Sequence, residues 1–137
     1  EQMLALGRAT RAAIEATGRR ALLLASNSLS HRHFVTEHDV PEDMSKEHIT
    51  SHHQHLWDIR MIEMMREGEL QRVLDEMPEF TEQAVSETDC GGLSWLIGAL
   101  GVDAGPGELY GYGTVIGTGN AVIGWLSNDE IAVEEGV

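Results

Sequence analysis

The feature that most constrains the fold is a short apolar run, "ALLLAS" at residues 21–26, which directly follows a helical segment. In residues 2–17 apolar side chains recur at roughly helical spacing, and Gly18 follows as a typical helix stop. A run of this length bounded by Ser and Asn is typical of a strand covered on both faces, although periodicity alone leaves a buried helical turn open. The chain is therefore expected to be an α/β protein.

Beyond this run the pattern predicts further helices. Ser45 is a suitable N-cap for a long helix that ends at Gly68. Pro78 stands at a suitable first helical position, which indicates that a helix over residues 69–76 ends there and a new one runs to near Glu87. The middle of the chain is therefore expected to be helical, with a break at the proline.

The glycine-rich part of the chain predicts one more helix and a pair of strands. "GGLSWLIGALG" reads as a buried helix closed by Gly101. "LYGYGTVIG" and "AVIGWL" are rich in β-branched and aromatic residues, and "TGN" between them predicts a tight turn. Residues 128–137 form an acidic tail. Residues 1–127 are therefore expected to form one folded unit, followed by this tail.

Charge and cysteine content limit the partners and the compartment. The 137 residues include 23 acidic and 9 basic side chains, a formal charge of -14, which argues against nucleic acids and anionic membranes as partners. Cys90 is the single cysteine, so no internal disulfide forms and a cytoplasmic location is expected. The longest apolar stretch, around 93–102, is too short to span a bilayer. The sequence starts in mid-helix without Met, so a truncated or processed chain is expected.

Several residues are weaker candidates for chemistry. His48, His52 and His55 have the spacing of one helix face and could share a metal ion, but ordinary solvated histidines are far more common. Cys90 has no obvious base partner, which argues against a nucleophile. "GTGN" at 117–120 lacks a P-loop lysine and is interpreted as a turn.

The strongest candidates follow the apolar run and precede the buried helix. His31 and His33 lie in "SNSLSHRH", where a strand end would place them at a ligand site and an imidazole exchanges protons near neutral pH. Glu87 precedes a Gly-Gly helix start, whose N–H groups would keep a carboxylate ionised and able to bind a hard divalent metal. The plain alternatives are a loop histidine that bonds the backbone and a surface glutamate at a helix end.

Five stretches of the sequence together resemble the C-terminal half of the class III extradiol ring-cleavage dioxygenases. The likeness covers about residues 1–126, and the order and number of its segments make it specific. The stretches are "ALLLASNSLSHRHF", "VPEDMSKEH", "WDIRMIEMMREGEL", "ETDCGGLSWLIGALG" and "YGYGTVIGTGNAVIGW".

The resemblance implies a mixed central sheet flanked by helices, of which this chain is the C-terminal half. It also implies an Fe(II) ion held by two histidines and one glutamate, at which O2 cleaves the ring of a catechol or a 2-aminophenol. Under this resemblance Glu87 is the metal carboxylate, His31 is the acid/base histidine and His33 contacts the substrate. The two metal histidines belong to a front half that this sequence lacks, so a homologous or complementary chain would supply them and this chain alone would be inactive.

Two other functions stay open from the sequence. A related chain without its own metal ligands could serve as a non-catalytic partner subunit, and the histidine-rich helix could form a small metal-binding module. An incomplete sheet would also expose apolar surface, so association into an oligomer is expected.

Overall fold

The structure, a computed structural model, describes residues 1–31, 51–115 and 117–126. These residues combine helices with an antiparallel β-hairpin, which confirms the predicted α/β class. Within them, no helix is both long enough and apolar enough to cross a bilayer. In chain order the elements are α1 (Gln2–Thr17), α2 (His52–Glu67), α3 (Leu70–Ala84), the short 3-10 helix η1 (Glu87–Cys90), α4 (Gly91–Leu100), β1 (Glu108–Val115) and β2 (Thr118–Gly124).

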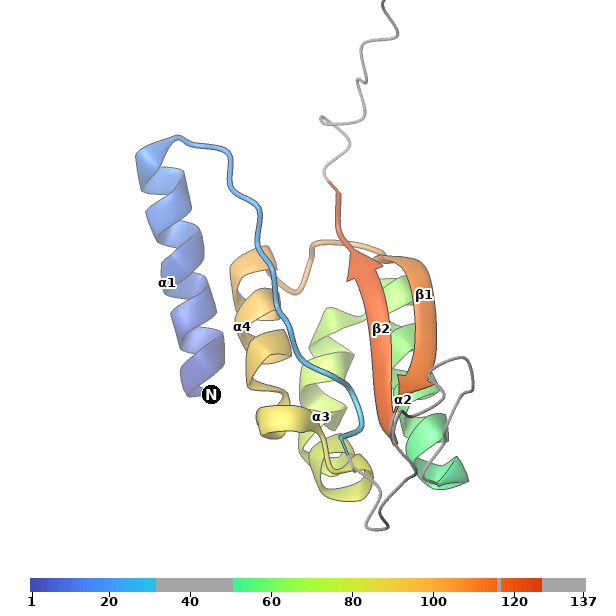
Figure 1. The fold of residues 1–137 in the computed structure, drawn as a ribbon. Coiled ribbons are helices and arrows are strands. Elements are labelled where there is room, and N and C mark those ends of the chain that lie inside the picture. Colours follow the sequence, from blue (N-terminus) through green and yellow to red (C-terminus); the bar gives the residue numbers. More distant parts are fainter. Residues whose placement is uncertain (32–50, 116, 127–137) are drawn as a thin grey trace, which may run out of the picture.

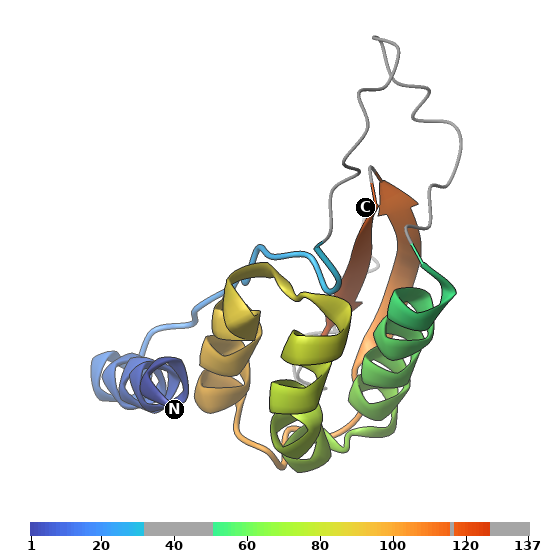
Figure 2. The same ribbon diagram turned by 90° about the horizontal axis from the view of Figure 1, so that it is seen from below.

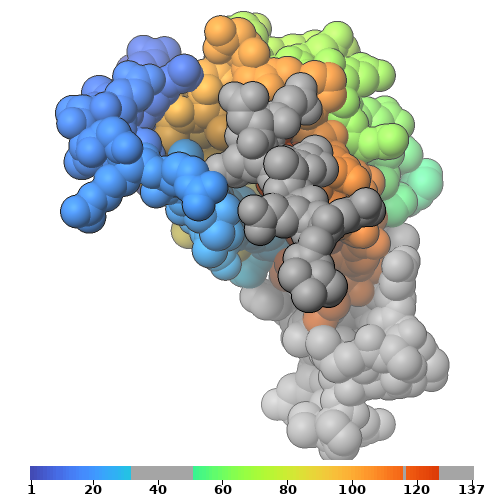
Figure 3. All heavy atoms as spheres, turned by 90° about the horizontal axis from the view of Figure 1, so that it is seen from above, coloured from blue at the N-terminus to red at the C-terminus, as the bar shows by residue number. Residues whose placement is uncertain are grey.

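The elements form two layers. The helices stand in a row in the order α1, α4, α3, α2, and the hairpin lies against one face of this row at its α2 end (Figure 1, Figure 2). From above, α1 and the segment that follows it lie along one edge of the molecule, and α2 and α3 lie along the opposite edge (Figure 3). The core contains fully buried apolar side chains from the helices, among them Phe80, Met61, Leu70, Ile97 and Val73.

The hairpin confirms both predicted strands but moves the turn between them. In the antiparallel ladder Val115 pairs with Thr118, and Gly113 pairs with Asn120. The stretch "TGN", which was predicted to be the turn, therefore begins β2, and that prediction is wrong. Gly117, just before it, has a φ of 78°, which glycine adopts without steric cost and which a tight hairpin turn requires.

Residues 21–26 do not form the predicted strand, nor the buried helical turn that was its alternative. Leu22 and Leu24 are 81% and 78% exposed, so the run is not covered on both faces. A strand needs a neighbour that accepts and donates backbone hydrogen bonds, and among the described residues no backbone hydrogen bond of this kind reaches 21–27. Pairing starts later, where the amide of Leu29 donates to the carbonyl of Gly119 over 2.8 Å.

The long central helix is shorter than predicted at its start. Ser51 has extended backbone angles, φ -150° and ψ 146°, and its hydroxyl accepts the Gln54 N–H, so α2 begins at His52. The predicted continuous helix from Ser45 is therefore wrong at Ser51, while Ser45 itself lies outside the described residues. The predicted end is confirmed, because Gly68 caps the helix with a φ of 78°.

The predicted helix break at Pro78 is also wrong, since α3 runs through it. A proline inside a helix removes one N–H donor and crowds the carbonyl four residues earlier. The apolar face of α3 outweighs this cost, because it buries side chains on both sides of the proline against the core. These buried residues are Leu70, Val73, Met77, Phe80 and Ala84.

The helices α1 and α4 form at the residues where the sequence predicted them, and the two pack closely against each other. Gly18 ends α1 with a φ of 61°, and Gly101 ends α4. At their contact a Cβ on Gly98 would lie 2.3 Å from the Leu4 carbonyl oxygen, and one on Gly7 would lie 2.1 Å from the Trp95 carbonyl oxygen. Only glycine fits at both positions, so this contact fixes α4 and the turn that leads into it.

Candidate active site

A polar pocket of about 560 Å³ lies where residues 24–31 meet η1 and the start of β2. His31 and Glu87 both line it, although their positions in the chain are 56 apart. The two side chains that were predicted to act together therefore face one pocket, while their roles stay predictions. His33, the third predicted site residue, lies outside the described residues. Thr118 and Asn120 of β2 complete the polar wall.

Two sets of backbone hydrogen bonds position these side chains. The Gly119 amide donates to the Ser30 carbonyl over 3.0 Å, which joins the segment to β2. On the other side the His31 amide donates to the Val85 carbonyl over 2.9 Å, and the Glu87 amide donates to the Leu29 carbonyl over 3.3 Å. Residues 29–31 are thus held between β2 and the turn before α4, which brings His31 and Glu87 together.

The turn that carries Glu87 has an uncommon backbone. Thr88, Asp89 and Cys90 have φ values of 48°, 51° and 54°, and Val85 has a φ of 53°. Left-handed backbone in residues other than glycine costs free energy and persists only where surrounding contacts enforce it. Backbone strain therefore flanks the predicted metal carboxylate on both sides, a feature that residue type at these positions did not signal.

Ser28 links the two predicted site residues and was missed in the sequence. Its amide donates to Glu87 Oε2 over 2.5 Å, and its hydroxyl oxygen lies 3.2 Å from the same carboxylate oxygen. The same hydroxyl oxygen lies 2.6 Å from His31 Nδ1. Donors to the Glu87 carboxylate were predicted at the Gly-Gly helix start, whereas the structure provides them from Ser28. The sequence feature that could have indicated this contact is a hydroxyl residue three positions before His31.

A second missed residue, Asp58, lies on α2 beneath the segment that bears His31. Its carboxylate is fully buried and accepts the Ser30 amide over 2.8 Å, the Ser30 hydroxyl over 2.7 Å and the Tyr112 hydroxyl over 2.9 Å. Burial raises the pKa of Asp58 above its ordinary value, while these donors lower it. Asp58 thus anchors Ser30, the neighbour of His31, to the helix layer.

The other candidate residues have different surroundings. His48 lies outside the described residues, and within the described part of the chain no three metal-binding side chains cluster. The His52 and His55 rings lie 6.5 Å apart, and His55 Nδ1 is 3.2 Å from the Tyr112 hydroxyl. Cys90 is buried, which raises the pKa of its thiol and disfavours the reactive thiolate.

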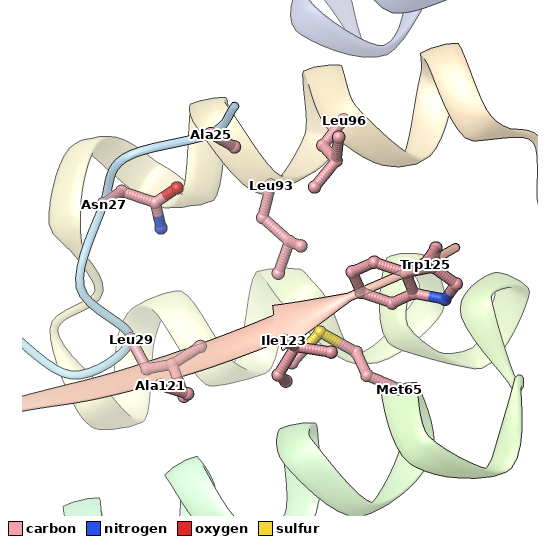
Figure 4. Close-up of a pocket in the computed structure, with 9 residues that line it drawn as sticks. All are labelled: Ala25, Asn27, Leu29, Met65, Leu93, Leu96, Ala121, Ile123 and Trp125. Atoms are coloured by element: carbon pink, nitrogen blue, oxygen red, sulfur yellow. The ribbon is translucent and has the colours of Figure 1, made fainter. Parts of the chain in front are cut away.

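A smaller apolar pocket of about 70 Å³ adjoins the polar one (Figure 4). Leu93 and Leu96 of α4 face Ile123 of β2 and Trp125, which follows β2, across it. The two pockets share three lining residues, Ala25, Asn27 and Ala121. The apolar pocket is therefore directly next to the polar one.

The residues of this pocket supply part of the iron site that the family resemblance implies. Such a site needs two imidazoles and one carboxylate on one face. Among the described residues Glu87 supplies a carboxylate of the right kind on the pocket wall, but no group of three ligands is present. The described residues therefore fit one ligand position and do not by themselves form the whole site.

Comparisons with known proteins identify the family of this chain. The family described as "Catalytic LigB subunit of aromatic ring-opening dioxygenase" matches residues 1–123. The chain is 52% identical to the 2-aminophenol 1,6-dioxygenase beta subunit of a Pseudomonas species over 90% of its length, and 30% identical to the 3,4-dihydroxyphenylacetate 2,3-dioxygenase of Escherichia coli over 72% of its length. It spans 41% and 34% of these two relatives. The chain belongs to the LigB family of aromatic ring-opening dioxygenases.

Proposed function

We propose that this chain is part of an extradiol dioxygenase, which inserts both atoms of O2 into the ring of a catechol or a 2-aminophenol. The observation that carries the proposal is the placement of His31 and Glu87 on one polar pocket, joined through Ser28. The names of the two relatives support the reaction class and the two kinds of substrate.

Within this function Glu87 is the carboxylate ligand of an Fe(II) ion. A 2-His-1-carboxylate site holds the ion on one face and leaves open positions for substrate and O2. The two imidazoles would come from residues beyond the described ones, in the same protein or in a partner chain. The first relative is named as a beta subunit, which supports a partner subunit for this protein.

His31 is the proton-transfer residue of the proposed reaction. An aromatic substrate that binds through adjacent oxygen or nitrogen atoms must lose a hydroxyl proton, and the opened ring later needs a proton back. A half-buried imidazole on the pocket wall can perform both transfers. His33, two residues further on, is proposed to orient the substrate.

Substitution of the two site residues in the intact, iron-loaded protein tests this function. His31→Gln is expected to lower the turnover of 2-aminophenol or a catechol by about 10²- to 10⁴-fold, because general acid/base catalysis contributes a factor of this size. Iron content should stay unchanged in this variant, whereas Glu87→Ala should lose the iron. O2 consumption and metal analysis measure the two effects. Full turnover in His31→Gln would remove His31 from the mechanism.

One observation favours a second candidate, a non-catalytic partner subunit. In the part of the chain that the structure describes, only a single ligand of the proposed iron site is found. A partner subunit would bind no iron in its purified intact form, and both variants above would leave the activity of the assembled enzyme unchanged. The same metal analysis therefore separates the two functions.

A further inference from the structure

The hydroxyl of Ser28 lies between the two residues that carry the proposed function. Its oxygen is 2.6 Å from His31 Nδ1 and 3.2 Å from Glu87 Oε2. Ser28 is only 6% exposed, so water does not readily replace either contact. The arrangement of protons among these three side chains therefore matters for how His31 reacts.

The number of available protons favours one arrangement. A hydroxyl carries one proton and accepts through its lone pairs, and an ionised carboxylate only accepts. If the Ser28 proton pointed to His31 Nδ1, two bare oxygens would face each other across 3.2 Å. If it points to Glu87, the hydroxyl oxygen can accept a hydrogen bond from His31 Nδ1, and both of these contacts then have a donor. The second arrangement places the proton of neutral His31 on Nδ1.

From this geometry we infer that Ser28 is a positioning residue, which holds His31 in the Nδ1-protonated tautomer and ties its ring to Glu87. The inference rests on the proposed function, since it gives Ser28 a role only if His31 transfers protons. The nitrogen that exchanges the proton with substrate is then Nε2. Nδ1 donates to Ser28 in both the neutral and the protonated ring, so the ring keeps its orientation during the transfer.

The segment keeps other anchors when the hydroxyl is removed. The Ser28 amide still donates to Glu87 Oε2, and Asn27 donates to the Ser28 carbonyl over 2.9 Å. Leu29 remains paired with Gly119 and with Glu87 through the backbone. Ser28→Ala is therefore expected to leave the backbone of the pocket in place and to change mainly the imidazole.

The first test reads the tautomer directly and needs no activity. The intact protein is prepared without iron and with ¹⁵N-labelled histidine, and the ring nitrogen shifts are recorded well above the ordinary histidine pKa. His31→Gln assigns the His31 signals by their loss. The wild-type protein should carry the proton on Nδ1, and Ser28→Ala should move it towards Nε2, which free histidine prefers. A wild-type His31 that is protonated on Nε2 would overturn the inference.

The second test compares turnover in the iron-loaded protein. Ser28→Ala should lower kcat by about 10- to 100-fold, as loss of a group that orients an active-site residue typically does, with iron content unchanged. KM should change by less than about twofold, because Ser28 acts through His31 and not on the bound substrate. Ser28→Thr keeps the hydroxyl and should restore most of the kcat. The matched control is Ser94→Ala on α4, whose hydroxyl donates to Met77 Sδ away from the pocket.

The outcomes separate this inference from the proposed function. Full turnover in His31→Gln would remove the proposed proton-transfer role of His31, while the tautomer measurement would still judge the contact with Ser28. Loss of turnover in His31→Gln, together with an unchanged tautomer and an unchanged kcat in Ser28→Ala, would overturn the role of Ser28 alone.

Discussion

Asp58 and Gly119 meet so closely that a Cβ on the glycine would lie 1.8 Å from Asp58 Oδ2. Gly119 is the second residue of β2 and its amide also donates to Ser30, so the contact joins the hairpin, α2 and the segment that bears His31. The smallest side chain is thus required where the buried carboxylate holds three parts of the chain together.

Gly119→Ala should destabilise the protein for this reason. The added methyl must displace either the Asp58 carboxylate or the strand, and overpacking of this kind costs about 1–3 kcal/mol. Urea denaturation followed by circular dichroism measures the loss in free energy of unfolding. Gly111→Ala is the matched control, because a Cβ there meets no atom within 4 Å. Equal stability of the two variants would contradict the close contact.

Gly98→Ala should weaken the contact between α1 and α4. Its Cβ would lie 2.3 Å from the backbone carbonyl oxygen of Leu4, which cannot move without shifting the whole helix. The expected loss is again about 1–3 kcal/mol in the free energy of unfolding. At Gly91, on the same helix, the nearest atom to an added Cβ is Met3 Cγ at 3.6 Å, an ordinary contact. Gly91→Ala should therefore keep more of the stability in a parallel melt.

Asp58 should make stability depend on pH in a defined direction. Burial is the largest influence and raises the folded-state pKa of Asp58 above its ordinary value of 3.8. The folded protein then binds this proton more tightly than the unfolded chain does, so the stabilisation from protonation is complete below pH 3.8 and is lost as pH rises through the raised folded-state pKa. Relative to Asp58→Asn, the wild type should therefore gain stability as the pH falls through this window.

A series of urea titrations on both proteins between neutral and acidic pH measures this difference. Other titrating groups are common to the two proteins and cancel in the comparison. A difference in unfolding free energy that stays constant with pH would show that the hydrogen bonds from Ser30 and Tyr112 balance burial. A change in the opposite direction would show that they outweigh it.

Pro78→Ala should stabilise α3. The exposed proline lies inside a continuous helix, where it removes the N–H that would donate to the Leu74 carbonyl. Alanine restores the N–H donor and removes the clash of the proline ring with the preceding turn. The free energy of unfolding should rise by about 1–3 kcal/mol, because the gain in helix propensity exceeds the opposing increase in the entropy of the unfolded chain. Glu79→Ala, its exposed neighbour, serves as the reference. An unchanged melting temperature in Pro78→Ala would mean that the proline is accommodated without cost.

The sequence predicted those features whose cause is local. Helix α1 with its Gly18 cap, helix α4 with its Gly101 cap and both hairpin strands follow from residue type and spacing over a few positions. The strand at 21–26 could not be judged in this way, because a strand exists only with a neighbour to bond. The predicted helix break at Pro78 was wrong for a related reason. Burial of the apolar face of α3, which depends on the rest of the fold, stabilises the helix by more than the proline costs locally.

The candidate site shows the same limit. His31 and Glu87 stood out because of where they lie relative to an apolar run and a helix start, and the structure places both on one pocket. Ser28 and Asp58 gave no comparable signal. Their importance arises from contacts across 59 and 28 residues of sequence, which spacing along the chain does not reveal.

The open stretch at residues 21–27 has a practical consequence for handling this protein. Leu22 and Leu24 are exposed, and the peptide groups around them bond to no other backbone group among the described residues. An exposed strand edge of this kind readily pairs with another strand. A polypeptide limited to these 137 residues should therefore self-associate as its concentration rises. Lysine in place of Leu22 would keep such a polypeptide dispersed for spectroscopy and leave the pocket residues untouched, whereas Leu24 lines the polar pocket and is better kept.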